Sequence, residues 1–337
     1  MQLSVLDQSP VPEGSSPADA LRNSVDLARL ADDLSYHRYW LAEHHGTPML
    51  ASTSPEVLIA AVAAATARIR VGSGGVMLPH YSPLKVAELF SVLSALHPSR
   101  IDLAVGRAPG TDPVTTFALQ RDRRQAAPDD FPDQLAELIA YVDGDLPPNH
   151  PFARLTALPG LPERPDLWLL GSSPQSAIWA AQLGLPYAFA DFINPAGAEI
   201  AGLYRDRFEP SARLERPHVC VASSVVCADT DEEASRLAAS GRMTYRMLRQ
   251  GRPIPIPPPD KALRYLAEAR ASAKPSGRRG IVGSPQVVKE GLDSVATEYG
   301  ADELMVVTIT YDHEARRRSY ELVAEAFALA PTADAAA

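Results

Sequence analysis

The hydrophobic pattern of the chain repeats one unit, in which a short apolar stretch precedes a longer amphipathic one. Apolar stretches of strand length occur at residues 3–8, 38–45, 69–78, 100–108, 166–173, 186–194, 218–228 and 301–310. Helical patterns lie between these eight predicted strands. A strand followed by a helix, repeated eight times, is the pattern of a (β/α)8 TIM barrel.

Clear helix starts strengthen this prediction. A Ser-Pro pair, which is a preferred N-cap followed by a preferred first helical residue, occurs at 16–17, 54–55, 82–83, 173–174 and 284–285. The pair at 194–195 is Asn-Pro, and residues 230–233 form a predicted capping box. A doubly wound open sheet is the competing architecture, but the eight units and the lack of a dinucleotide fingerprint favour the barrel.

Two stretches interrupt the pattern. Residues 109–165 hold one predicted helix, at 129–142, within a loop rich in Pro, Gly and Asp. Residues 250–283 contain, near their start, RPIPIPPPD at 252–260, which cannot form a helix or a central strand. Because loops at the C-terminal face of a barrel carry function, both insertions are interpreted as covers over one active site, with plain surface loop as the alternative for 250–283. We expect one domain over residues 1–330 and a flexible tail at 331–337.

Composition narrows the classes of function. The net charge of -9 argues against nucleic acid or an anionic membrane as the main partner. The first residues show no signal-peptide pattern, and no apolar run reaches the roughly 18 residues of a membrane helix, so a cytoplasmic protein is expected. Cys220 and Cys227 lie seven residues apart and would face opposite sides of one strand, so they cannot pair with each other.

The segment LAEHHGTP, residues 41–48, carries adjacent histidines at a strand end. Strand alternation predicts that Trp40, Ala42 and His44 point into the barrel, whereas Glu43 and His45 share the outward parity. The two histidines therefore diverge, and we expect no metal site here. His44 is the candidate catalytic group, because it points inward at a C-terminal strand end. The alternative is a polar side chain that bonds a loop.

Two further strands predict room for a flat ligand. Gly72 and Gly74 are the inward pair of VGSGG, and glycine inside a strand suits close ligand approach or unusual backbone, including a cis peptide. Ala104 and Gly106 are small inward residues of the strand at 100–108. Arg107 follows at its end, where a lone arginine is equally an ion-pair partner.

The turn after the strand at 166–173 is the clearest ligand feature. Gly171, Ser172 and Ser173 lead into a helix that starts with proline, which places free N–H groups and two hydroxyls at a helix N-terminus. A phosphate site and an ordinary N-cap are both consistent with this pattern. The sequence has no Walker A motif, no G-x-G-x-x-G and no G-x-S-x-G. We expect a phosphorylated flat ligand and no nicotinamide domain.

Taken together, these segments resemble the bacterial luciferase-like flavin-dependent monooxygenases over residues 2–329. The resemblance is carried by LDQSPVPEG, YWLAEHHGTP, RIRVGSGGVMLPHYSPLKVAE, GRAPGTD, WLLGSSPQSA, VGSP and GADELMVVTITYDHEARRRSYELVAEA, in this order. It implies a barrel that binds FMN as FMNH2, supplied by a separate flavin reductase. It also implies O2 as co-substrate, a flavin C4a-hydroperoxide as the oxygenating species, and a small organic substrate.

The resemblance also implies roles for individual residues. His44 matches the histidine beside the reactive flavin edge, and Arg107, Ser172 and Ser173 match the phosphate-binding residues. A non-proline cis peptide beside the flavin is expected near Ser73-Gly74. Relatives of this type often form homodimers through the helices that follow the second and third strands.

Departures from the light-emitting enzyme limit what is carried over. Gly106 stands where that enzyme has a reactive cysteine, and Gly110 where it has an aromatic residue, so neither light emission nor aldehyde oxidation is expected. An F420-dependent hydride-transfer enzyme, a non-catalytic flavin-binding barrel and a metal hydrolase are the alternative functions. Tailoring of an aromatic polyketide, as in antibiotic biosynthesis, is a hypothesis for the substrate.

Overall fold

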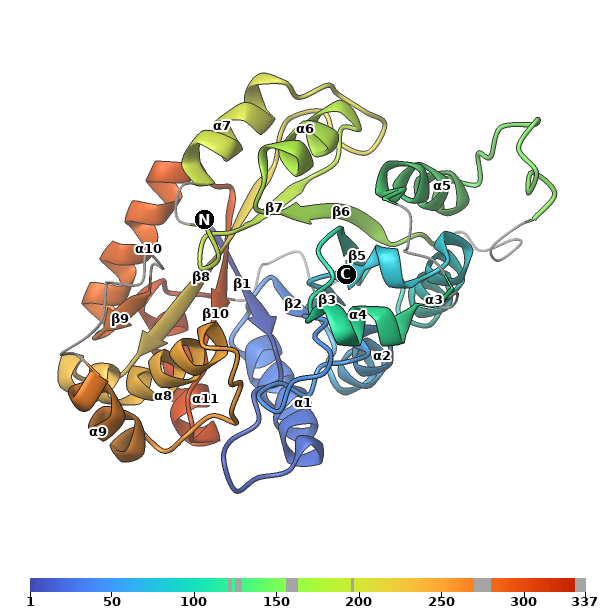
Figure 1. Cartoon of the computed structure of the whole chain (residues 1–337). Helices are drawn as coiled ribbons and strands as arrows, with labels where there is room; N and C mark the ends of the chain where they lie inside the picture. The colour runs from blue at the N-terminus through green and yellow to red at the C-terminus, as the bar shows by residue number, and fades with distance from the viewer. Residues whose placement is uncertain (121–122, 125–128, 156–162, 195–196, 270–279, 331–337) are drawn as a thin grey trace.

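The chain folds into a closed parallel barrel (Figure 1). The computed structural model describes residues 1–120, 123–124, 129–155, 163–194, 197–269 and 280–330. The barrel strands are β1 (Gln2–Asp7), β2 (Arg38–Leu41), β3 (Arg70–Ser73), β5 (Ile101–Gly106), β6 (Asp166–Gly171), β7 (Tyr187–Ala190), β8 (Val219–Cys227) and β10 (Glu303–Val307). Strand β10 pairs with both β1 and β8, which closes the barrel. The predicted TIM barrel is confirmed.

All eight predicted strands exist, but most end earlier than the apolar pattern does. The segment expected to be a strand at 38–45 leaves the sheet after Leu41. The segment at 69–78 is divided into β3 and a short β4 (Val76–Met77), which pairs with β5. A further short strand, β9 (Ile281–Gly283), extends β8 beyond the barrel. The strand ends therefore become loops at the rim, where a site can form.

Helices surround the barrel (Figure 1). They are α1 (Pro17–Asp33), α2 (Pro55–Ala65), α3 (Pro83–Leu96), α4 (Pro113–Leu119), α5 (Phe131–Asp143), α6 (Pro174–Gln182), α7 (Gly197–Asp206), α8 (Asp231–Arg249), α9 (Pro259–Ala269), α10 (Pro285–Tyr299) and α11 (His313–Ala326). Helix α5 agrees with the helix predicted at 129–142. Three helices, α8, α9 and α10, lie between β8 and β10 along the chain.

The Ser-Pro pairs mark the helix starts correctly, since α1, α2, α3, α6 and α10 each begin at the proline. The serine hydroxyl caps the helix in only two of these cases, Ser16 and Ser173. The Thr230 hydroxyl accepts a hydrogen bond from the backbone N–H of Glu233, which is one of the two bonds of the predicted capping box. The Asn-Pro pair at 194–195 lies partly outside the described residues.

The strands are two-sided, with one core on each face. Tyr39 and Leu41 belong to the large cluster between the barrel and its helices. Trp40 and Ala42 belong to a second cluster inside the barrel, where the rings of Trp40 and Trp168 meet edge-to-face with centroids 5.1 Å apart. The predicted alternation along β2 is therefore confirmed.

The two cysteines follow the same alternation on β8. Cys220 belongs to the cluster inside the barrel, and Cys227 belongs to the outer cluster. Both are buried and both are free thiols. The expectation that they face opposite sides of one strand is confirmed.

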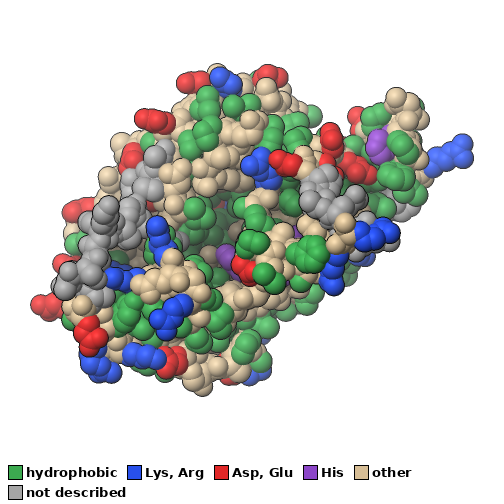
Figure 2. Space-filling view, viewed as in Figure 1, with side chains coloured by type: hydrophobic (Ala, Val, Ile, Leu, Met, Phe, Trp, Pro, Cys, Tyr) green, Lys and Arg blue, Asp and Glu red, His purple; other side chains and the backbone are tan. Residues whose placement is uncertain are grey.

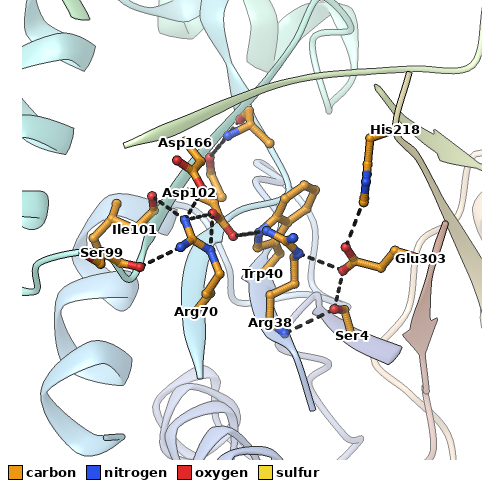
Figure 3. A network of polar contacts seen from close by, with 12 residues as sticks. Ser4, Arg38, Trp40, Arg70, Ser99, Ile101, Asp102, Asp166, His218 and Glu303 are labelled. Atoms are coloured by element: carbon orange, nitrogen blue, oxygen red, sulfur yellow. Dashed lines mark hydrogen bonds and ion pairs between the residues drawn. The ribbon is translucent and has the colours of Figure 1, made fainter. Parts of the chain in front are cut away.

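A buried ionic network closes the N-terminal end of the barrel (Figure 3). The guanidinium of Arg38 donates to Asp102 Oδ2 and to Glu303 Oε1, each at 2.7 Å. Trp40 Nε1 and Arg70 Nε also donate to Asp102, at 2.8 and 2.9 Å. Burial by itself raises the pKa of Glu303, but the charge of Arg38 and the hydrogen bonds from His218, Arg38 and Ser4 together outweigh it, and the pKa falls to about 2. Charged side chains thus fill the barrel below the apolar interior.

Candidate active site

A cavity of about 2100 Å³ opens at the carboxyl ends of the barrel strands. Trp40, Cys220 and Met305, all from the cluster inside the barrel, contribute to its lining. Loops after β2, β3, β5 and β6 contribute the rest of the wall on that side. Figure 2 shows the molecule hollowed at this face, with hydrophobic side chains inside the hollow. TIM-barrel enzymes carry out their chemistry at this end.

His44 lies just beyond β2 and lines the cavity. Its backbone N–H donates to the carbonyl of Ser52 at 2.8 Å, which fixes the loop. Its ring nitrogen Nδ1 is buried and has no hydrogen-bond partner among the described residues. Burial, together with the charge of His45, lowers the pKa of His44 to about 4. The ring is therefore neutral at neutral pH and can hold or move a proton at Nδ1.

Glu43 anchors the loop that carries this histidine. Its buried carboxylate accepts hydrogen bonds from His45 Nε2 at 2.7 Å and from the Tyr81 hydroxyl at 3.0 Å. It also accepts from the backbone N–H of Met77 at 2.9 Å, so it ties the end of β2 to β4. This geometry agrees with a supporting role for Glu43 and His45.

Over the described part of the chain, no group of three His, Cys, Asp or Glu side chains could hold a metal ion.

A glycine pair borders the cavity after β3. The peptide bond between Gly74 and Gly75 is cis, one residue later than the position predicted near Ser73-Gly74. A Cβ on Gly74 would lie 2.5 Å from Leu6 Cδ1, and one on Gly75 would lie 2.5 Å from Leu170 Cδ1. Both residues line the cavity, so glycine is required on this wall by close packing.

Ser73, a candidate cofactor-binding residue, faces away from the cavity that the other candidates line. Its side chain is buried, donates to the carbonyl oxygen of Ala104 at 2.8 Å and accepts from the N–H of the same residue at 3.0 Å. It does not line the cavity. Because Gly74 faces inward, its neighbour Ser73 faces outward, and the hydroxyl joins β3 to β5 instead.

Arg107 and the serine turn lie on the same cavity as His44. Arg107 follows β5, and its guanidinium carbon lies 5.7 Å from the centroid of the Trp179 ring on α6. Its side chain makes no hydrogen bond or ion pair with any other described residue. Ser172 and Ser173 connect β6 to α6. The predicted phosphate-binding residues are therefore brought together.

Gly171 has a packing role in this turn. A side chain on Gly171 would collide with Ser176, whose hydroxyl lies 3.1 Å from the Tyr187 hydroxyl. Ser173 Oγ accepts from the N–H of Ser176 at 3.3 Å, so one serine serves as the N-cap. The hydroxyl of Ser172 makes no hydrogen bond with another described residue, and the backbone carbonyl of Ser172 accepts from Asn194 Nδ2 at 3.1 Å.

The sequence alone does not identify α8 as a wall of the cavity. Arg242, Arg246 and Arg249 all line it, from a helix predicted only as part of the repeating pattern. The available signal was the spacing of these arginines by four and then three residues, which places them on one helix face. That spacing is equally typical of a helix face exposed to solvent.

No described helix is long and apolar enough to cross a membrane.

The fold and the site define a class, the TIM-barrel protein with a large ligand cavity at the carboxyl ends of its strands. Comparison with known proteins is more specific. Residues 1–303 match the family model for luciferase-like monooxygenase, so the chain belongs to the luciferase-like monooxygenase family. It is a flavin-dependent monooxygenase by this membership.

Individual relatives cover nearly the whole chain. A luciferase-like monooxygenase of Escherichia coli (strain K12) is 43% identical over 322 residues, which is 95% of each chain. The N-acetyl-S-alkylcysteine monooxygenase of Bacillus subtilis (strain 168) is 37% identical over 332 residues, covering 97% of this chain and 98% of the relative. The crystal structure of apo-MsnO8 has a TM-score of 0.90 at 45% identity and covers 98% of this chain and 99% of its own.

More distant structures share the fold alone. One is the oxygenating component of 3,6-diketocamphane monooxygenase from Pseudomonas putida in complex with FMN, at 19% identity and a TM-score of 0.70, covering 98% of both chains. Another is an F420-dependent secondary alcohol dehydrogenase, at 13% identity and a TM-score of 0.62, covering 96% and 98%. The same fold therefore accommodates either type of cofactor.

Proposed function

We propose that the chain is the oxygenase of a two-component system, which takes FMNH2 from a separate flavin reductase and uses O2 to oxygenate a small organic substrate. The observation that carries the proposal is the convergence of three features on one cavity. They are the unpartnered Nδ1 of His44, the glycine wall of Gly74 and Gly75, and Arg107 beside the serine turn.

The residues present fit FMN. Arg107 supplies an unpaired cation, and Ser172 and Ser173 supply hydroxyl and helix N-terminal N–H donors, which together suit a phosphate. Gly74 and Gly75 present backbone without side chains to the cavity, which suits the face of a flat ring. Reduced FMN, when bound, would supply the two electrons that activate O2.

His44 and the insertions have separate proposed tasks. His44 holds or moves a proton at Nδ1, because its neutral ring has no competing partner. Segments from both insertions line the cavity, including Pro109 and Gly110 from the first and Gln250 and Pro253 from the second. They would exclude water from the reacting centre, which protects the activated oxygen.

The substrate is proposed from relatives and chemistry. A thioether of the N-acetyl-S-alkylcysteine type is one candidate, because a relative at 37% identity is named for it. An aromatic polyketide in antibiotic biosynthesis is another. F420-dependent hydride transfer stays the alternative reaction, because a phosphate site and a flat-ring wall suit a deazaflavin as well.

Anaerobic titration followed by mixing with O2 tests the function. We expect FMNH2 to bind tightly and reduced F420 weakly, and O2 to produce a transient species whose absorbance differs from those of reduced and oxidised FMN. Stopped-flow absorbance is the measurement. A preference for F420, or no transient, would contradict the monooxygenase proposal and leave the barrel assignment intact.

The same titration with Arg107→Ala tests the phosphate site. FMN affinity is expected to fall about ten- to hundredfold, the range for one charged hydrogen bond. Riboflavin has no phosphate, so its affinity should not change. An unchanged ratio of FMN to riboflavin affinity between variant and wild type would remove Arg107 from the site.

A homodimer is proposed through α2 and α3. Their exposed faces carry Val57, Val92 and Leu96, which are 68%, 45% and 65% exposed. Burial of such apolar side chains favours self-association. Sedimentation velocity should give a dimer for the wild type and a monomer for Val92→Asp/Leu96→Asp. A wild-type monomer at micromolar concentration speaks against the proposal.

A further inference from the structure

The arginines of α8 form a cationic stripe on the cavity. Arg242, Arg246 and Arg249 lie on one face of the helix and all three line the cavity. Arg242 and Arg249 are exposed and make no hydrogen bond or ion pair with other described residues. Arg246 is half-buried, with its guanidinium carbon 5.9 Å from the centroid of the Tyr265 ring.

A fourth arginine on the same helix behaves differently. Arg236 pairs with Glu233 at 3.2 Å and with Asp260 at 3.3 Å, and it does not line the cavity. Its charge is thus balanced within the protein. The contrast shows that the charges of Arg242 and Arg249 are not paired with a carboxylate of another described residue.

The lining of the cavity has the opposite sign from the protein as a whole. The chain carries a net charge of -9. Among the described lining residues, the arginines are Arg107, Arg242, Arg246 and Arg249, and the one carboxylate is Asp112. Asp112 already caps α4, because it accepts from the N–H groups of Val114 and Thr115. A cavity lined with one sign of charge attracts small molecules of the other.

The stripe lies across the barrel from the glycine wall. Around the closed barrel, β8 is the fourth strand from β3 in either direction, so the two strands lie opposite each other. Gly74 and Gly75 follow β3, and α8 follows β8. In Figure 2, Lys and Arg side chains border the hollow on the side that α8 occupies in Figure 1. If FMN occupies the glycine side, the arginines face the remaining space.

That space also has apolar walls. Ile193, Leu248 and Leu266 line the cavity, and Ile193 and Leu248 are 62% and 42% exposed. The unpartnered Nδ1 of His44 borders the same cavity. An apolar body with one anionic group matches this combination better than a neutral hydrocarbon does.

We infer that the substrate is a small organic anion, a carboxylate with an apolar body, whose carboxylate is bound by Arg242 and Arg249 of α8. The inference rests on the proposed function and narrows its substrate class. Arg242 and Arg249 are substrate-binding residues, distinct from the phosphate site at Arg107. The guanidinium forks of arginine suit the two oxygens of a carboxylate.

Calorimetric titration with a matched pair of probes tests the inference. The probes are S-benzyl-N-acetylcysteine and its primary carboxamide, which differ in the charged group alone. Wild-type protein, with and without oxidised FMN, should bind the carboxylate about ten- to hundredfold more tightly than the amide. Added salt should weaken binding of the carboxylate probe and leave binding of the amide probe unchanged.

Variants locate the effect. Arg242→Gln/Arg249→Gln should bind both probes equally, Arg242→Lys should retain part of the preference, and Arg236→Gln on the same helix should retain all of it. The FMN affinity of the double variant should not change. Both replaced residues are exposed, and an unchanged unfolding midpoint confirms an intact fold.

Several results would overturn the inference. They are equal binding of the two probes, no binding of either to the wild type, an equal loss in Arg236→Gln, or a drop in FMN affinity in the double variant. The last result would assign the stripe to the cofactor. Because probe binding is measured without O2 and also without FMN, these failures are distinct from a failure of the proposed monooxygenase reaction.

Discussion

His44→Ala protein is expected to bind FMN within about tenfold of the wild type and to form oxygenated product about 10²- to 10⁴-fold more slowly, the range for loss of a positioned acid-base group. The physical reason is the state of this ring. It is neutral, its Nδ1 is buried without a partner, and alanine leaves nothing to hold a proton at that point. Oxygen should still be consumed and released as H2O2.

The measurement is the yield of product and of H2O2 per O2 consumed, with chemically reduced FMN and S-benzyl-N-acetylcysteine as the probe substrate. His45→Ala is the matched control, because His45 lines the same cavity but donates to Glu43 instead of presenting a free nitrogen. Its effect should be much smaller. If His44→Ala and wild type form the same amount of product per O2 consumed, or if His44→Ala and His45→Ala lose the same amount, His44 has no specific role in the reaction.

Arg38→Met should destabilise the fold by about 3–5 kcal/mol at pH 7, the usual effect of removing one partner of a buried ion pair. Arg38 is the residue that joins Asp102 to Glu303 at the closed end of the barrel (Figure 3). Without it, Glu303 keeps the hydroxyl of Ser4 and the ring of His218 at 3.6 Å. Neither of these replaces a buried guanidinium. Urea unfolding at several pH values is the measurement.

The pH dependence distinguishes this mechanism from loss of packing. The wild-type pKa of Glu303 lies near 2, below its ordinary value of 4.5, so its contribution is complete above pH 4.5 and is lost as pH falls toward 2. The destabilisation in Arg38→Met should therefore be largest at neutral pH and shrink in acid. The double variant Arg38→Met/Glu303→Gln should recover part of the lost free energy of unfolding. Removing the exposed ion pairs of Arg236 should lower the free energy of unfolding by under about 1 kcal/mol. If the difference in unfolding free energy between wild type and Arg38→Met does not change with pH, the destabilisation comes from the packing of methionine and not from the lost ion pair.

The barrel and the inward positions could be predicted because both follow from local rules. Strand alternation placed Trp40 inside and Tyr39 outside, and Ser-Pro pairs located the helix starts. The same local rule explains why Ser73, a predicted cofactor residue, does not line the cavity. Its parity is opposite to that of Gly74, and its hydroxyl is already bonded across the sheet to Ala104.

The α8 wall could not be predicted, because it depends on contacts between distant segments. Gly241 on α8 lies near Ile309, beyond β10, and no local pattern in either segment indicates this contact. An arginine stripe in sequence does not reveal whether it meets solvent or a cavity. Likewise, the carboxylate of Glu43 reaches Met77 and Tyr81, more than thirty residues away, and no local pattern shows that.

Gly106 differs from Gly74 and Gly75, which line the same cavity. A Cβ built at Gly106 would approach Met77 Sδ at 3.8 Å and no other atom within 4 Å, whereas one at Gly74 or Gly75 would collide with a neighbour at 2.5 Å. Sequence divergence at position 106 can therefore change which molecules fit without a compensating change elsewhere. A side chain at 74 would instead displace Leu6, and one at 75 would displace Leu170 and the backbone of Ala104. The cavity wall at Gly106 can therefore vary in evolution by single mutations, whereas the adjoining wall at Gly74 and Gly75 is constrained by its neighbours.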